Sequence, residues 1–249
     1  MAVVLKSSQE IEKMRRAGQV VREVLELVRS RVKPGATTYD LEKAAQERLN
    51  QLGVKAAFKG YHGFPCVLCT SVNSEVVHGI PSPKRVLKQG DIVSVDFGVV
   101  VDGYYGDAAI TVPVGKVAPD AERLLKVTEA SLHAGIAAVR PGATLGDVGA
   151  AVQGVVEREG FSVVRDFVGH GIGAQMHEEP QVPNFGEAGR GMKLKTGMVI
   201  AIEPMVNAGK PDVVVLDDGW TAVAKDGSMS AHFEHTVAVT ADGSRILTE

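Results

Sequence analysis

Hydrophobic residues recur at helical spacing in four segments of the chain. The pattern predicts a long first helix that starts after Ser7, and further helices near 38–51, 119–138 and 144–159. Three helix starts carry a Ser or Thr followed three positions later by an acid, which is the spacing of a capping box. These pairs are Ser7 with Glu10, Thr37 with Asp40, and Thr144 with Asp147.

Between the helical segments lie apolar runs that are typical of strands. The runs predict strands near 66–72, 76–78, 91–112, 162–168, 197–206, 212–216, 220–224 and 231–247. The dipeptides Asp102-Gly103, Asp218-Gly219 and Asp242-Gly243 favour hairpin turns. Grouped helices with hairpin-linked strands predict an α+β fold with a mainly antiparallel sheet.

The chain contains an internal repeat. Residues 32–53, VKPGATTYDLEKAAQERLNQLG, match 139–160, VRPGATLGDVGAAVQGVVEREG, at an offset of 139 − 32 = 107. GDIVSVD (90–96) matches GMVIAIE (197–203) at the same offset, 197 − 90 = 107. We expect one domain over 1–249, built from duplicated halves of approximately 1–118 and 119–249.

Composition and charge exclude several classes of protein. The 249 residues are 45% hydrophobic, which is enough for a large core, and the net charge of −3 argues against a dedicated nucleic-acid binder. No apolar run approaches the roughly 20 residues of a membrane span, and no secretory signal is visible. With two cysteines, a disulfide framework is not expected, so we predict a soluble, cytoplasmic protein.

Five polar residues stand beside or inside strand-like apolar runs, where a lone charge is expensive to bury. They are Asp96, Asp107, His170, Glu203 and Glu234. Four carboxylates and one imidazole form an oxygen-rich ligand set that can neutralise two divalent cations. The offset of 107 also relates Asp96 to Glu203, so under a pseudo-twofold these two acids would face each other.

Hairpin geometry supports convergence of the first two acids. A two-residue loop at Asp102-Gly103 would place Gly98 opposite Asp107, with Asp96 on the same face and diagonal to Asp107. Diagonal neighbours lie roughly 7–8 Å apart, which is within reach of a shared ion. Glycines on both sides of His170, in GHGIG (169–173), allow a close approach of the backbone.

These residues lie in motifs that resemble type I methionine aminopeptidases, which are metallopeptidases with the pita-bread (creatinase/aminopeptidase-like) fold. The resemblance covers essentially the whole chain. It rests on YHGFPCVLCTSVN (61–73), VVHGIP (76–81), VDFG (95–98), GYYGDAAIT (103–111), GHGIGAQMHEEP (169–180), AIEP (201–204) and FEHTV (233–237). The resemblance implies a curved, mainly antiparallel sheet with the helices outside.

The resemblance also implies roles for the five residues. Asp107 and Glu234 would bridge two divalent ions, His170 and Glu203 would complete one ion, and Asp96 would hold the other. The ions would be Co, Mn, Fe or Zn, and a pair of ions can lower the pKa of a shared water toward about 7. The activated water would attack the first peptide bond and release the N-terminal methionine, preferably before a small second residue.

Further residues take roles by the same resemblance. Glu203 would shuttle a proton, His177 would stabilise the oxyanion, and His78 would bind the substrate amide. An apolar pocket for methionine would use Tyr61, Phe64, Cys69, Met176 and Trp220. Ordinary core packing or loop hydrogen bonding is the alternative for each of these. Cys66 and Cys69 lack a second cysteine pair for zinc, so we expect both to be reduced, buried thiols.

Two other functions are compatible with this fold. One is a proline-directed aminopeptidase or prolidase, which usually carries a large N-terminal domain, whereas only about 90 residues precede Asp96 here. The other is a non-catalytic binding module, against which the complete ligand set argues. The expected partners are nascent polypeptide N-termini, with possible transient contact with the ribosome, no dedicated nucleic-acid or membrane binding, and a monomeric state.

Overall fold

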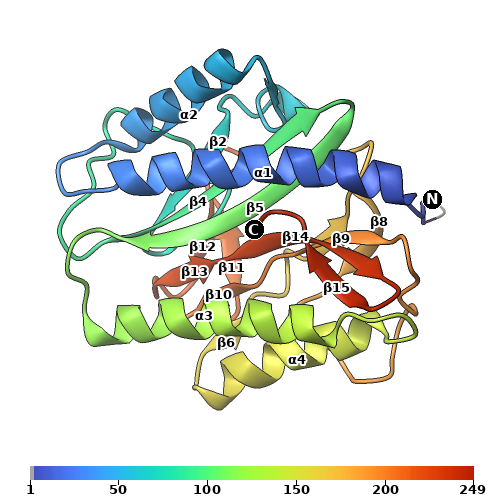
Figure 1. The fold of residues 1–249 in the computed structure, drawn as a ribbon. Coiled ribbons are helices and arrows are strands. Elements are labelled where there is room, and N and C mark those ends of the chain that lie inside the picture. Colours follow the sequence, from blue (N-terminus) through green and yellow to red (C-terminus); the bar gives the residue numbers. More distant parts are fainter. Residues whose placement is uncertain (1–2) are drawn as a thin grey trace.

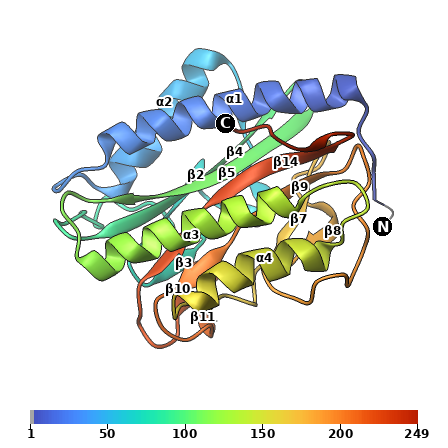
Figure 2. The ribbon, with the colours of Figure 1, turned by 60° about the horizontal axis from the view of Figure 1, so that its bottom comes forward.

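The computed structural model describes residues 3–249, and across these residues the helices lie on one face of a curved sheet (Figures 1 and 2). The helices are α1 (Ser8–Arg31), α2 (Thr38–Leu52), α3 (Pro119–Ala138) and α4 (Leu145–Arg158). The main sheet runs in the order β1-β4-β5-β14-β9-β7-β8, with β2 paired to β4 and β15 paired to β14. Its strand pairs are antiparallel, so the predicted α+β class is confirmed.

Nine strands form this main sheet. They are β1 (Lys55–Ala56), β2 (Leu68–Val72), β4 (Ile92–Val101), β5 (Tyr104–Pro113), β7 (Gly169–Gly171), β8 (Glu178–Val182), β9 (Val199–Ile202), β14 (Glu234–Thr240) and β15 (Gly243–Ile246). Two three-stranded sheets flank it. They contain β3 (Glu75–Val77), β6 (Ser162–Val163), β10 (Met205–Asn207), β11 (Val213–Val215), β12 (Ala222–Ala224) and β13 (Ser230–His232).

The three predicted capping boxes are present at the starts of α1, α2 and α4. Each one satisfies backbone N–H groups that the first helical turn leaves free. The helices then bury their apolar stripes in two neighbouring cores. One core joins α1 and α2 to β2, β4 and β5, and the other joins α3 and α4 to β9 and β14. Within residues 3–249, no helix has both the length and the hydropathy that crossing a bilayer requires.

The same hydrogen bonds recur 107 residues apart. The N–H of Gly35 donates to the Leu87 carbonyl at 2.9 Å, and the N–H of Gly142 donates to the Leu194 carbonyl at 2.9 Å. Thr37 also bridges Val86, as Thr144 bridges Lys193. The repeated sequence therefore builds the same helix-loop-strand unit on both sides of the sheet.

Several strand predictions need correction. The segment 162–168 forms only the two-residue strand β6, and 197–206 is interrupted between Ile202 and Met205, where Glu203 and Pro204 lie. The register pairs Thr240 with Gly243, so the loop is Ala241-Asp242 rather than Asp242-Gly243. Asp218-Gly219 lies inside a wider loop, because the last paired residues there are Val215 and Ala222.

Candidate metal centre and adjoining pocket

The five residues singled out in the sequence come from five neighbouring strands of the main sheet. In sheet order, β4 carries Asp96, β5 carries Asp107, β14 carries Glu234, Glu203 directly follows β9, and β7 carries His170. All five line one cavity. The sheet therefore brings together residues that are up to 138 positions apart, since 234 − 96 = 138.

The predicted hairpin geometry is confirmed. Val101 pairs with Tyr104 and Gly98 pairs with Asp107, across a two-residue turn at Asp102-Gly103. Asp96 pairs with Ala109, which in turn pairs with Glu234 on the next strand. Since alternate residues of a strand share a face, Asp96, Asp107 and Glu234 lie on the same face of the sheet.

His170 is oriented by its own backbone. Its Nδ1 lies 2.9 Å from the Gly171 carbonyl, which can only accept a hydrogen bond, so Nδ1 donates and Nε2 carries a lone pair. Nε2 then lies 3.5 Å from Glu203 Oε1 and 4.0 Å from Asp107 Oδ2. Burial lowers the pKa of His170 to about 3, so its Nε2 is unprotonated and can bind a cation.

The glycines around His170 are required by close packing, as expected. A Cβ on Gly169 would lie 2.2 Å from the Ala201 carbonyl oxygen, and one on Gly171 would lie 2.3 Å from that of Glu179. Real Cβ atoms do not approach a backbone this closely. Glycine at both positions therefore lets β7 sit tightly between β8 and β9 and aim His170 into the cluster.

The carboxylates are buried beside one another without counter-charges. Burial, and next the charge of Asp107, raises the pKa of Asp96 well above its usual range. Burial also raises the pKa of Asp107 to about 7, and burial raises those of Glu203 and Glu234 well above normal, with the charge of Asp107 next in each case. Four acids buried together therefore retain protons, and a bound cation that displaces these protons would stabilise the ionised carboxylates.

The donor atoms fit a divalent cation. Ligand atoms of Asp107, His170 and Glu234 all lie within 4.8 Å of one another. Asp96 Oδ1, Asp107 Oδ1 and Glu234 Oε1 are buried and have no hydrogen-bond partner. Buried oxygens are rarely left unpaired, and carboxylate oxygens with one imidazole suit Mn²⁺, Fe²⁺ or Co²⁺ as well as zinc.

The cluster forms the end of a cavity of about 490 Å³ with largely apolar walls. The five residues expected to form a methionine pocket, Tyr61, Phe64, Cys69, Met176 and Trp220, all line it. The Phe64 and Trp220 rings meet edge to face, with their centroids 5.1 Å apart.

Cys69 is an unpaired, fully buried thiol whose pKa is raised well above normal by burial, and Cys66 is also unpaired and buried.

Two further histidines face the same cavity. His78 follows β3 with a positive φ of 61°, and burial lowers its pKa to about 4. His177 lies against His170, with ring centroids 4.2 Å apart, and burial lowers its pKa. The Tyr61 hydroxyl lies 2.7 Å from His177 Nδ1, so Tyr61 contacts a histidine as well as forming part of the wall.

A buried ion pair holds the loop that carries Met176 and His177. Lys6 Nζ donates to Glu178 Oε2 at 2.5 Å, with side-chain exposures of 3% and 11%. Glu178 Oε1 accepts from the N–H of Gln175 at 3.1 Å, so the same carboxylate ties both ends of the loop. The segment before α1 therefore supports the pocket wall.

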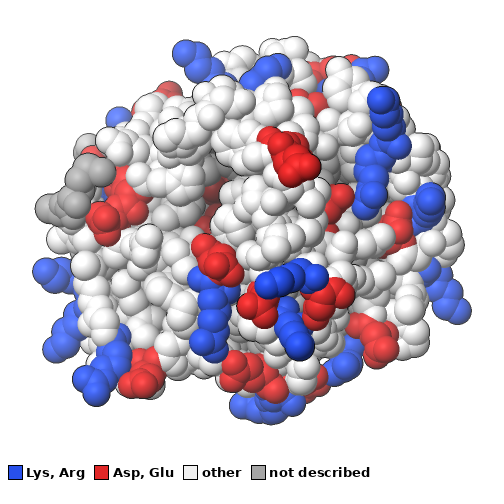
Figure 3. Space-filling model, turned by 180° about the vertical axis from the view of Figure 1, so that it is seen from behind, with Lys and Arg blue, Asp and Glu red and all other residues white. Residues whose placement is uncertain are grey.

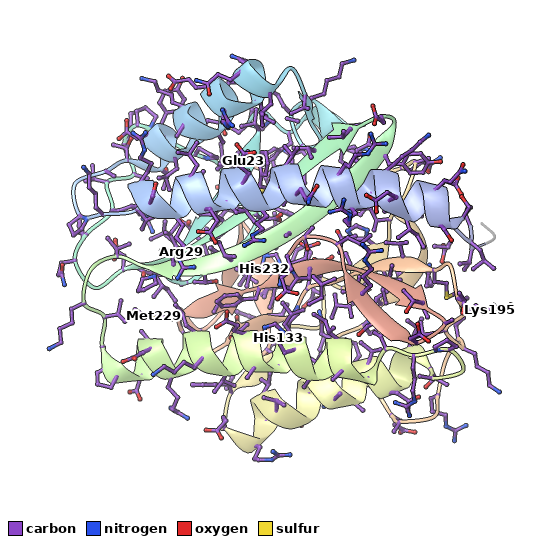
Figure 4. The ribbon with its side chains drawn as sticks, in the orientation of Figure 1. Glu23, Arg29, His133, Lys195, Met229 and His232 are labelled. Carbon is purple, nitrogen blue, oxygen red and sulfur yellow. The ribbon has the colours of Figure 1, made fainter. Side chains whose placement is uncertain are left out.

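The sequence did not single out some cavity residues. They are His62, Val77, Phe167 and Val168. His62 has a positive φ of 46°, which a sequence does not reveal, although the neighbouring Gly63 was a signal of an unusual backbone. The sequence also did not single out His232, which is labelled in Figure 4. This histidine is buried, and neither of its ring nitrogens has a hydrogen-bond partner among the described residues.

The surface adds little to this picture. On the face opposite the helices, Lys and Arg side chains are spread out and mixed with acidic ones rather than gathered into one patch (Figure 3).

Comparisons with known proteins agree with this geometry. Residues 12–241 match the family model "Metallopeptidase family M24". A protein of Synechocystis named methionine aminopeptidase A is 53% identical over 99% of this chain and 97% of its own length. A methionine aminopeptidase of Clostridium perfringens is 50% identical over 99% and 98%.

Solved structures confirm the predicted pita-bread fold. The crystal structure of a methionine aminopeptidase from Thermotoga maritima matches with a TM-score of 0.98 and 50% identity, covering 100% of both chains. A prolidase from Pyrococcus horikoshii matches with a TM-score of 0.77 and 21% identity over 99% of this chain and 63% of its own, which shows the fold alone. The chain belongs to metallopeptidase family M24, among the methionine aminopeptidases.

Proposed function

We propose that this protein removes the N-terminal methionine from polypeptides by metal-dependent hydrolysis, with preference for a small second residue. The observation that carries the proposal is the unprotonated Nε2 of His170, which points at Glu203 and Asp107, two acids of the cluster that lines the cavity. The apolar cavity next to it suits the long, soft side chain of methionine.

The donor set supports two divalent ions of Mn, Fe, Co or Zn, held by Asp96, Asp107, His170, Glu203 and Glu234. Bound ions of this kind polarise a carbonyl and lower the pKa of water. Four carboxylates against two divalent ions leave a cluster that is close to neutral, which suits its apolar surroundings.

Glu203 is suited to move a proton. Its side chain is 13% exposed and opens to the cavity, whereas Asp107 and Glu234 are more deeply buried. Glu203 would accept the proton of the attacking water and pass it to the leaving amine.

His177 is suited to stabilise the oxyanion. A neutral ring that accepts from the Tyr61 hydroxyl at Nδ1 carries its proton on Nε2, where it can donate to a developing negative charge. His78 also lines the cavity, is neutral and lies against Trp220 and Phe167, and it would hydrogen-bond the substrate amide.

A peptide assay during metal titration tests the proposal. We expect free methionine from Met-Ala-Ser, less from Met-Leu-Ser, and none from N-acetylated Met-Ala-Ser. Release should rise with added Mn²⁺ or Co²⁺ and stop with a chelator. Cleavage of Ala-Pro-Ser instead would favour a proline-directed peptidase, and no cleavage at any metal concentration would favour a binding module.

Nascent chains are the natural source of such substrates, and we propose them as the partner. The cytoplasmic location, the monomeric state and the contact with the ribosome stay predictions from the sequence.

A further inference from the structure

The small sheet beside the cavity ends in an exposed, apolar edge strand. Its order is β11-β12-β3, so β11 has a neighbour on one side only. Val214, Val215 and Leu216 are 41%, 55% and 44% exposed. An apolar edge strand invites pairing with another chain, and proteins usually protect such edges with charges or prolines.

The free edge has a defined hydrogen-bonding pattern. The N–H of Leu216 donates to the Thr221 carbonyl, and the N–H of Lys225 donates to the Asp212 carbonyl. In an antiparallel pair, such bonded positions alternate with positions whose N–H and C=O point away from the partner strand. Val213 and Val215 therefore direct their backbone groups outward.

This edge lies near the cavity, with the strand β12 between β11 and β3. Val215 pairs with Ala222, and Ala222 pairs with Val77, the residue before His78. Two strand spacings of about 4.8 Å place Val215 about 10 Å from Val77. The loop that joins β11 to β12 carries Trp220 into the cavity wall, held by hydrogen bonds of 2.8 Å from the Trp220 and Thr221 N–H groups to Asp218 Oδ1.

The cavity cannot hold a whole substrate. Its volume of about 490 Å³ suits a ligand of a few residues, so the rest of a polypeptide must leave across the surface. We propose that the substrate chain, from about its fifth residue onward, binds the free edge of β11 as an added strand. This inference rests on the proposed function.

Strand addition fits the chemistry of such a substrate. Polypeptides that share only a first methionine differ in every later side chain, and pairing through the main chain is independent of side chains. An extended chain advances about 3.3 Å per residue, so about three residues cover the 10 Å from His78 to Val215. Contact with Val215 then begins near the fifth residue of the substrate.

The experiment compares kcat/KM for Met-Ala-Ser and for the octapeptide Met-Ala-Ser-Thr-Thr-Ser-Thr-Ser. We expect the octapeptide to be better by about tenfold, since two or three additional hydrogen bonds form. N-methylation of the octapeptide at residue 5 or at residue 6 should remove the gain at only one of the two, because alternate N–H groups face the edge.

A protein variant tests the same contact from the other side. Val215→Pro removes the outward N–H and keeps the pairing with β12, so it should abolish the octapeptide gain and leave Met-Ala-Ser unchanged. Val215→Ala keeps the N–H and should retain the gain. The melting temperature of both variants should match that of the parent protein.

Other outcomes overturn the inference. Equal kcat/KM for the two peptides, equal loss at both N-methylated positions, or an equal loss in Val215→Ala would each rule out strand addition at β11. Failure to cleave Met-Ala-Ser at all would instead refute the proposed function, so the two failures are distinguishable.

Discussion

The two halves of the molecule begin alike and then diverge. In the first half, Val114 pairs with Asp91 beside the strand that carries Asp96, and in the second half Val239 pairs with Met198 beside the strand that leads to Glu203. Asp91 and Met198 keep the repeat offset, since 198 − 91 = 107. Their partners Val114 and Val239 are offset by 239 − 114 = 125. The second half therefore contains 125 − 107 = 18 additional residues.

The additional length changes what each half contributes. The first half turns directly from β4 to β5 at Asp102-Gly103 and forms a continuous floor for Asp96 and Asp107. The second half leaves β9 after Ile202 and builds β10 to β13 before it returns as β14. That excursion carries Trp220 and the exposed edge of β11. The repeated units thus build the scaffold, and the additional segment of the second half carries residues of the proposed substrate contacts.

The largest expected effect distinguishes the roles of Glu203 and Asp96, the two acids that occupy equivalent positions in the two halves. Glu203→Gln should lower kcat by about 10³-fold even at saturating metal, because a proton carrier is lost. Asp96→Asn should chiefly weaken metal binding, so added Mn²⁺ should restore much of its activity. Metal content by mass spectrometry and kcat at rising Mn²⁺ measure both effects. Equal recovery of the two variants would show that the acids are interchangeable.

The next effect concerns the contact between the halves at Lys6 and Glu178. Lys6→Met leaves a buried carboxylate without its partner and should destabilise the protein by about 3 kcal/mol. Arg16→Met, which breaks the exposed pair with Asp102, is the matched control and should cost less than about 1 kcal/mol. Chemical denaturation measures both. Similar losses would mean that the Lys6 pair is no more important than a surface pair.

A smaller effect is expected in the loop of the second half that carries His177. His177→Ala should reduce kcat by about 10²-fold while the metal content stays intact. Tyr61→Phe should reduce it less, since only the orientation of the ring is lost. Turnover of Met-Ala-Ser and metal analysis provide the test. Unchanged kcat in His177→Ala would remove this residue from the mechanism.

The last effect is the pH dependence of the metal-free protein. The pKa of Asp107 is raised to about 7, and those of Asp96, Glu203 and Glu234 are raised well above normal, so the folded protein keeps protons that the unfolded chain has released. The contribution of Asp107 ends near pH 7, where that carboxyl ionises. Above pH 7, stability continues to fall by about 1.4 kcal/mol per pH unit for each proton that Asp96, Glu203 or Glu234 still holds.

Calorimetry from pH 7 to 9, with a chelator or with Mn²⁺, measures this dependence. Below pH 6.5 the buried histidines, whose pKa values are lowered, act in the opposite direction, so the test uses the higher range. We expect the melting temperature to fall with pH only in the metal-free protein. A flat profile with the chelator would show that the carboxylates do not repel one another.

Much of the fold and of the cluster was predictable from the sequence because local rules determine it. Capping boxes mark helix starts, and the hairpin turn at Asp102-Gly103 determines which residues share a face with Asp107. The short strands β7 and β8 were missed because GHG and EEPQV show neither apolar alternation nor strand propensity.

Contacts between distant segments were not predictable in the same way. The hydrogen bond between Tyr61 and His177 spans 116 positions and depends on how the sheet curves. The edge of β11 became visible only when the strand order was known, because the run VVVL at 213–216 is equally typical of a central strand.

Each of the five proposed metal ligands lies on or directly after a different strand, so the curvature of the sheet sets the distances between them. Flattening β4, β5, β14, β9 and β7 would move every donor atom away from its neighbours at once, whereas no single side-chain rotation could do so. The packing of α1 and α3 against the other face of the sheet therefore influences which cation radius the proposed site prefers. Core substitutions in that packing would change the metal preference without altering a ligand.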